Sequence, residues 1–197
     1  MTRKIYREDE FFMIKEYAGT ILDEISLALK DMDYDILWKM VAEIHGANRI
    51  FFHSVGRPAI NMKNFAMYLK HFGYRHHIIG DATCPAIKPG DALVMVSACG
   101  EEANLITAAE TVEKIGDIKK IIVTANAEST LAKKGDVVVK LNTPIPGSAE
   151  DTSIQPIGSQ FEQAVLYVMD VGMSHYFMAR LGITLGGGQN PLHANLQ

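Results

Sequence analysis

The chain has 197 residues, of which 48% are hydrophobic and 21% charged, and its formal net charge is -4 at pH 7. This size and composition allow one complete core, which excludes a largely disordered chain. The acidic balance argues against a general nucleic-acid coat. No apolar run approaches the ~20 residues of a membrane span, and the N-terminus lacks the apolar segment of a secretory signal. We expect one cytoplasmic domain over residues 1–197 that binds neither nucleic acid nor membrane.

The first 46 residues predict two helices that precede any strand. Apolar residues recur in the first helix at spacings of three and four, and so form one stripe: Ile14, Tyr17, Ala18, Ile21, Leu22, Ile25, Ala28 and Leu29. Asp33 or Asp35 can cap the second helix. Both helices need a surface to cover, which is either their own sheet or a second subunit.

Residues 47–141 alternate between strand and helix patterns. Apolar stretches predict five strands, at 49–54, 76–79, 92–96, 120–124 and 137–141. Helices are predicted between them at 59–72, 103–115 and 129–134. Strands separated by helices indicate βαβ units, so the fold class is α/β with a five-stranded parallel sheet.

The last part of the chain combines a loop, a long helix and a tail. Residues 142–155 contain prolines, glycine and serines and predict a surface loop, long enough to be functional or mobile. A helix is expected over 156–181, with Pro156 in its first turn. Its body, residues 164–169, is apolar nearly all round. This predicts a buried helix, and the small domain suggests burial between subunits.

Two turns are candidates for a ligand site because ligands bind beyond the carboxyl ends of parallel strands. They are residues 54–59 and 97–102, each a turn of small residues that leads into a helix. Backbone N–H groups would point into the crevice there, although a tight turn that simply needs glycine gives the same pattern. Nucleotide-binding glycine motifs and closely spaced metal ligands are absent. Cys99 could act as a nucleophile at the helix entry, but no base is identifiable beside it.

The order of elements and several segments resemble the sugar isomerase (SIS) domain family, and within it the 6-phospho-3-hexuloisomerases. Besides Gly56-Arg57, the similar segments are 65–67, 84–87, 90–91, 97–101, 129–132, 155–162 and 193–196. The resemblance implies a three-layer α/β/α sandwich of flavodoxin-like type, preceded by the two N-terminal helices. It also implies a homodimer or homotetramer with active sites near subunit contacts.

The resemblance implies that a 3-ketohexose 6-phosphate becomes fructose 6-phosphate through an enediolate, without a redox or metal cofactor. Glu162 would transfer the proton; burial would raise its pKa and the helix N-terminus would lower it, and the residues do not decide between them. His193 would open the sugar ring or assist proton transfer, and Arg57 would hold a phosphate or sugar oxygen. The plainer alternatives are a first-turn acid, a tail histidine and a surface ion pair. The implied substrate-binding residues are Ser54, Gly56, Arg57, Ser97, Cys99, Gly100, Glu101, Glu102 and Gln155.

The chain departs from the family pattern in both turns. The family commonly has Gly-x-Gly-Arg-Ser-Gly in the first turn and Ser-Gly-Ser-Gly-Glu-Thr in the second. The departures are Ser54, Pro58, Ala59, Ala98, Cys99 and Glu102. A carboxylate ~4 Å from a phosphate would cost roughly 4 kcal/mol per unit charge at an effective dielectric of 20, against about 1 kcal/mol for a lost neutral hydrogen bond. Glu102 therefore turns away, or the phosphate binds elsewhere, or the ligand differs.

Three functions remain open from the sequence. The first is a phosphosugar isomerase, and the second is a non-catalytic protein that binds a sugar or a sugar phosphate through an altered turn. The third is a structural module for oligomerisation, suggested by the long apolar helix.

Overall fold

The computed structural model describes residues 8–180 and residue 182. Its centre is a five-stranded sheet in the order β2-β1-β3-β4-β5, and all four strand pairings are parallel. The strands are β1 (Ile50–Ser54), β2 (His76–Ile78), β3 (Ala92–Val96), β4 (Lys119–Thr124) and β5 (Val137–Lys140). The predicted parallel sheet and its five strands are confirmed, each within one residue at either end.

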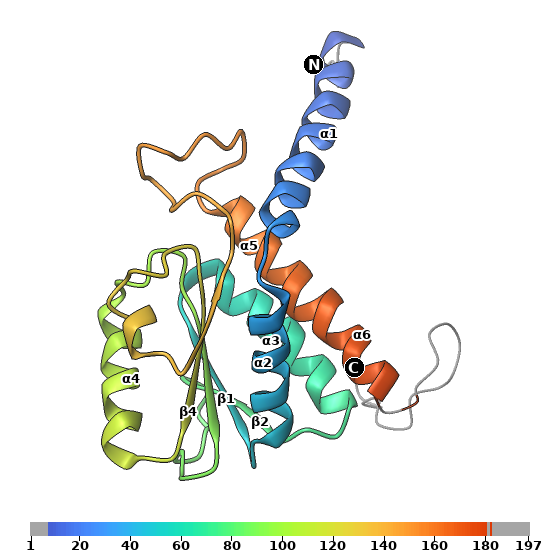
Figure 1. The fold of residues 1–197 in the computed structure, drawn as a ribbon. Coiled ribbons are helices and arrows are strands. Elements are labelled where there is room, and N and C mark those ends of the chain that lie inside the picture. Colours follow the sequence, from blue (N-terminus) through green and yellow to red (C-terminus); the bar gives the residue numbers. More distant parts are fainter. Residues whose placement is uncertain (1–7, 181, 183–197) are drawn as a thin grey trace, which may run out of the picture.

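Helices cover both faces of the sheet (Figure 1). One face carries α2 (Tyr34–Gly46), α3 (Gly56–His71) and a long helix made of α5 (Ser159–Leu166), the π-helical segment η2 (Tyr167–Met173) and α6 (Ser174–Arg180). The other face carries α4 (Ala103–Ile115) and the short 3-10 helix η1 (Ala132–Lys134). The layers form the expected α/β/α sandwich, and the strand order is that of flavodoxin-like folds.

Two apolar clusters hold the layers together. Phe51 and Phe52 are neighbours on β1, yet each belongs to a different cluster because successive side chains of a strand point to opposite faces. Phe52 packs with α2, α3 and α5, while Phe51 packs with α4. All five residues of β3 are buried, which is the pattern of a strand covered on both sides.

The chain order creates a crevice between β1 and β3. From β1 the chain runs through α3 to the edge strand β2, and then returns to place β3 on the other side of β1. The helices that follow β1 and β3 therefore lie on opposite faces, and the carboxyl ends of these two strands form the switch point at which open α/β sheets bind ligands.

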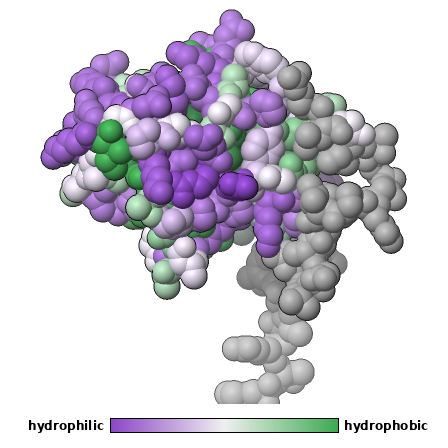
Figure 2. All heavy atoms as spheres, turned by 90° about the horizontal axis from the view of Figure 1, so that it is seen from below, coloured by the Kyte–Doolittle hydropathy of each residue, from purple (hydrophilic) through white to green (hydrophobic). Residues whose placement is uncertain are grey.

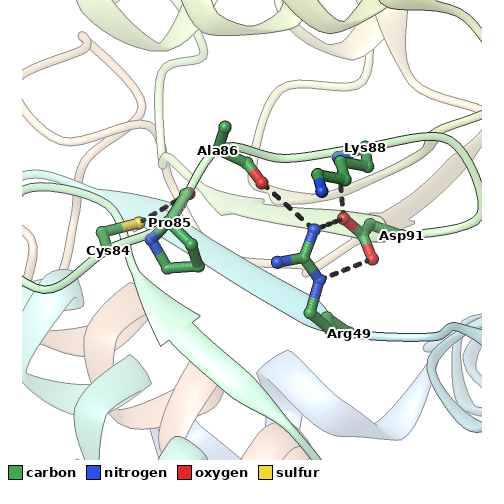
Figure 3. Close-up of polar contacts among 6 residues, drawn as sticks. All are labelled: Arg49, Cys84, Pro85, Ala86, Lys88 and Asp91. Atoms are coloured by element: carbon green, nitrogen blue, oxygen red, sulfur yellow. Dashed lines mark hydrogen bonds and ion pairs between the residues drawn. The ribbon is translucent and has the colours of Figure 1, made fainter.

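A buried ion pair fixes the return segment, residues 79–91, at the opposite edge of the sheet (Figure 3). The Arg49 guanidinium donates to both oxygens of Asp91 at 3.1 and 2.6 Å, and it also donates to the carbonyl of Ala86. The backbone N–H of Lys88 donates to the same carboxylate, which is almost fully buried. Since this edge lies away from the crevice, we assign the cluster to stability. Seen from below, this side of the molecule is mostly hydrophilic (Figure 2).

Cys84 lies in the same return segment and packs against the smaller apolar cluster. Burial and the nearby Asp81 carboxylate raise the pKa of its thiol, with Arg49 opposing them. The thiol therefore stays protonated at neutral pH, which fits a packing role.

The long C-terminal helix corrects two predictions. It begins at Ser159 and not at Pro156, because Gly158 adopts a left-handed conformation (φ 83°) and the Ser159 N–H closes a turn onto the Pro156 carbonyl. Most of its apolar body is also buried within its own chain, whereas the prediction placed this burial between subunits; Tyr167 is the exception and is 42% exposed. The buried apolar residues from the start of α5 to α6 are Phe161, Ala164, Val165, Val168, Met169, Met173 and Phe177.

Smaller differences concern helix ends. The helix after β1 begins at Gly56, three residues earlier than predicted, because a proline in the first turn costs no intrahelical hydrogen bond. The predicted helix at 129–134 contains only the three residues of η1. Of the two proposed caps of α2, the structure selects Asp33, whose carboxylate accepts the N–H groups of Asp35 and Ile36.

The first helix, α1 (Glu8–Lys30), projects beyond the carboxyl edge of the sheet (Figure 1). Its predicted apolar stripe is only partly covered: Ile25 and Ala28 are buried, whereas Ile14 and Leu22 are 57% and 61% exposed. The chain's own sheet, which was one of the two surfaces expected to pack against this helix, therefore leaves most of the helix uncovered. Among the described residues, no helix has the length and apolarity needed to span a bilayer.

Candidate functional site

The turn between β1 and α3 forms one side of the crevice. The Ser54 hydroxyl donates to the carbonyl of Val96 at 2.7 Å, so the carboxyl ends of β1 and β3 are tied together. No side chain caps the first turn of α3, which begins at Gly56. Its first N–H groups lack intrahelical acceptors and lie where an anionic group would bind. Ser54 also lines a hollow of about 260 Å³ that extends toward β2 between Met62, Ile78 and Asp81.

Arg57 joins this turn to the start of α5. Its Nη1 donates to the Ser159 hydroxyl at 2.9 Å, and its Nε lies 3.0 Å from Oε2 of Glu162. The Arg57 side chain is 60% exposed, whereas that of Glu162 is only 10% exposed. The structure thus brings together two residues predicted from segments about a hundred positions apart. A guanidinium at the surface covers a buried carboxylate.

The environment of Glu162 determines the direction in which the pKa of its carboxyl is shifted. Burial raises the pKa of the carboxyl above its usual value, and the ion pair with Arg57 only partly offsets this effect. A carboxyl with a raised pKa is a stronger base than an exposed one, and its pKa is closer to neutral pH, where one group can take up a proton and later return it. The group therefore has the properties of a general base that later acts as an acid.

Asn61 is a contact of this cluster that the sequence did not reveal. Its Nδ2 donates to the backbone carbonyl of Glu162 at 2.7 Å. Asn61 follows Arg57 by four residues, so α3 presents both side chains to α5 from one face. That spacing was a usable signal. The contact fixes the first turn of α5 and with it the position of the Glu162 carboxylate.

The turn between β3 and α4 forms the other side of the crevice. The Ser97 hydroxyl donates to the Glu102 carboxylate and accepts the N–H of Gly100 at 2.6 Å. Glu102 is thus turned into the turn and not away from it. Cys99 is half-buried, and its carbonyl accepts from the Asn126 amide at 3.4 Å.

Gly100 and Glu101 connect this turn to the loop after β4. Gly100 has a φ of 72°, and a Cβ at this position would lie 2.1 Å from the Ser129 hydroxyl oxygen. The exposed Glu101 carboxylate accepts the N–H of Thr130 at 2.9 Å, and this hydrogen bond holds its pKa below the usual value. Both predicted residues lie at the turn, but the Glu101 side chain binds the neighbouring loop.

Gln155 binds α1 instead of standing free at the crevice. Its amide donates to the Glu24 carboxylate at 2.8 Å, and Ser153 and the N–H of Ile154 donate to the same group. Burial works to raise the pKa of Glu24, but these hydrogen bonds outweigh it and keep the pKa low. The predicted loop at 142–155 is therefore anchored just before α5. Glu24 gave no signal in the sequence because it belongs to the polar side of an amphipathic helix.

Two further predictions concern histidine and metal ions. His193 lies outside the described residues. Within residues 8–180 and 182, no three His, Cys, Asp or Glu side chains are grouped so that they could hold a metal ion.

Comparisons with known proteins found a matching family model, relatives in sequence and solved structures with a similar fold. The family model of the SIS domain matches residues 43–165. A Bacillus subtilis protein named 3-hexulose-6-phosphate isomerase is 32% identical in an alignment of 161 residues that covers 79% of this chain and 84% of the relative.

Solved structures share the fold. A Methanococcus jannaschii protein, whose crystal structure infers the molecular function of a 3-hexulose-6-phosphate isomerase, has a TM-score of 0.69 and 24% identity, covering 87% of this chain and 92% of that one. The Vibrio vulnificus NanR protein complexed with ManNAc-6P has a TM-score of 0.71 and 20% identity, covering 86% and 63%. At these identities the two structures speak for the fold alone.

Proposed function

The chain belongs to the SIS domain family, and on this premise we propose that it is a phosphosugar isomerase that moves a carbonyl between adjacent carbons, as 6-phospho-3-hexuloisomerases do. The observation that carries the proposal is the buried Glu162 carboxyl with its raised pKa, which lies beside Arg57 at the carboxyl edge of the sheet. The similarity to the Bacillus subtilis isomerase supports this reaction class.

In the proposed reaction Glu162 removes the proton at C2 of a 3-ketohexose 6-phosphate. The electrons form an enediolate between C2 and C3. A proton moves from the oxygen on C2 to the oxygen on C3, and the same carboxyl group returns a proton to C3, which gives fructose 6-phosphate. Arg57 donates from its exposed fork to an oxygen of the sugar or to its phosphate. Asn61 holds the first turn of α5 so that the carboxylate keeps its place. His193 retains its proposed part in ring opening or proton transfer, and no cofactor is required.

We also propose that the protein works as a homodimer or homotetramer. A groove of about 410 Å³ runs beside α1 between Leu22, Ile25, Leu29, Tyr34 and Tyr167. Together with the exposed apolar residues nearer the start of α1, it forms a surface that water solvates poorly. A second copy of the chain offers the same surface and would bury it by two-fold symmetry.

Light scattering tests the assembly. The native protein should have at least twice the mass of 21.7 kDa, and Leu22→Glu should reduce the mass to that of one chain. Asp23→Asn, at the adjacent exposed position, serves as the control and should leave the assembly intact. A native monomer, or an unchanged mass in Leu22→Glu, would contradict the proposal.

A second function, non-catalytic binding of a sugar or sugar phosphate, is favoured by one observation. The Glu102 carboxylate binds Ser97 inside the turn that should accept a phosphate. A protein that only senses a ligand tolerates such a change better than an enzyme that must turn over a phosphorylated substrate.

One experiment separates the two functions. Purified protein is incubated with a panel of ketose and aldose phosphates that includes fructose 6-phosphate, and products and melting temperatures are measured. Interconversion of fructose 6-phosphate with a 3-ketohexose 6-phosphate supports the isomerase. Thermal stabilisation without product supports the binding protein. If no sugar gives either response, both functions fail and the structural module for oligomerisation remains.

A further inference from the structure

The turn between β3 and α4 already contains an anionic group. Ser97 is 2% exposed, and its single hydroxyl proton is directed to the Glu102 carboxylate. The oxygen of the same hydroxyl accepts the N–H of Gly100. The hydroxyl is therefore fully engaged inside the protein, and no proton on it is left for a ligand oxygen.

The carboxylate also lies at the start of a helix without capping it. Glu102 is the N-cap residue of α4, but its side chain accepts no hydrogen bond from the backbone of that helix. The positive end of the α4 dipole attracts whichever negative group is nearest. Here that group is the Glu102 carboxylate of the protein itself, which repels a second anion.

The neighbouring carboxylate shows that this orientation is specific. Glu101 points out of the turn and binds the N–H of Thr130. Gly100 lies against Ser129 so closely that the chain has little freedom to exchange the directions of the two side chains. Of the two adjacent acids, only Glu102 engages the Ser97 hydroxyl.

We propose that Glu102 is a specificity-determining residue: its carboxylate occupies the position of a ligand's phosphate at Ser97 and the start of α4, and a phosphosugar binds there only by displacing it. The proposal rests on the proposed function and refines it. Native protein binds phosphate weakly in this turn, and loss of the negative charge strengthens the binding of phosphorylated ligands but not of uncharged sugars.

Substitutions of Glu102 test this directly. Glu102→Gln removes the charge and keeps an oxygen that can accept from Ser97, and Glu102→Thr removes the carboxylate and supplies a hydroxyl donor. Glu113→Gln makes the same change of charge on the exposed side of α4 and is the control. Calorimetry gives the dissociation constants of inorganic phosphate, fructose 6-phosphate and fructose, and circular dichroism verifies folding.

The expected result is a gain of about tenfold in affinity for inorganic phosphate and fructose 6-phosphate in both Glu102 variants. A tenfold change corresponds to about 1.4 kcal/mol. Fructose affinity should stay unchanged, and Glu113→Gln should behave as the native protein. If one of the two Glu102 variants does not fold, the other decides the outcome.

Three results would overturn the proposal. These are unchanged phosphate affinity in the folded variants, an equal gain in Glu113→Gln, and weaker binding of fructose 6-phosphate without Glu102. Isomerase turnover is measured on the same samples. A gain in phosphate affinity without turnover in any sample defeats the isomerase and leaves the role of Glu102 intact. Turnover with unchanged phosphate affinity supports the isomerase and contradicts the proposed role of Glu102.

Discussion

The two turns that border the crevice are equivalent in the fold, since each joins a strand to the helix that follows, but they carry side chains of opposite charge. Each follows a buried strand and enters a helix whose first turn no side chain caps. The β1–α3 turn presents the exposed Arg57 guanidinium, whereas the β3–α4 turn holds the Glu102 carboxylate against Ser97. Parallel sheets supply the backbone geometry of such turns in general. Single side chains therefore decide which turn attracts a ligand's negative charge.

The largest effect is expected at the residue covered by the β1–α3 turn. Glu162→Gln keeps the shape of the side chain but cannot accept a proton, so kcat should fall by about 10²- to 10⁴-fold. In the native protein, kcat/KM should decline as the pH falls through a pKa above the ordinary 4.5 of glutamate, because burial favours the protonated, inactive form. Steady-state rates between pH 4 and 8 measure both effects. Native turnover in Glu162→Gln would remove Glu162 from the mechanism.

The geometry of the β3–α4 turn is tested by Gly100→Ala. The new Cβ meets the Ser129 hydroxyl and must also adopt a positive φ. We expect a loss of about 3 kcal/mol in the free energy of unfolding, which for a chain of this size lowers the melting temperature by about 10 °C. Gly182→Ala is the control for backbone strain alone, since its φ is 68° but the space around it is open; it should cost about 1 kcal/mol. Equal losses would show that the contact with Ser129 does not constrain the turn.

A smaller effect is expected from Arg57. Arg57→Ala removes the donors for a ligand oxygen, so KM for a phosphosugar should rise about tenfold, as for one charge-assisted hydrogen bond. It also removes the cation that lowers the pKa of Glu162, so the acid limb of the pH profile should move to higher pH. Arg57→Lys keeps a charge without the fork and should raise KM while leaving the limb nearer its native position. A limb that does not move in Arg57→Ala would show that the ion pair is irrelevant to Glu162.

Much of the layered core could be predicted because its signals are local. The continuous apolar run of β3 and the carboxylate of Asp33 each depend on a few neighbouring residues, and the structure bears both out. The predicted start of α5 at Pro156 was wrong because Gly158 adopts a left-handed conformation, so that the helix begins only at Ser159. Such a turn leaves no periodic signal in the sequence. The burial of the helix that follows was assigned to a subunit contact, although α3 and the sheet suffice to cover it.

The residues of the candidate site were predicted from the resemblance, and their contacts were not. The resemblance identified Arg57 and Glu162, and the structure joins them through an ion pair that no local pattern encodes. The direction of the Glu102 side chain depends on Ser97 and on the close approach of Gly100 to Ser129, which only the folded chain brings together. The anchoring of the Gln155 loop by Glu24 links residues 131 positions apart. These are tertiary contacts between segments distant in sequence, so local patterns in a single sequence do not predict them.

The central claim, proton transfer by Glu162, is tested most directly by hydrogen exchange. Fructose 6-phosphate is incubated in D₂O with native protein or with Glu162→Gln, and deuterium at C3 is followed by nuclear magnetic resonance. The native protein should label C3, and Glu162→Gln should do so at least about 100-fold more slowly while still binding the sugar phosphate. Labelling at the native rate by Glu162→Gln would contradict the account.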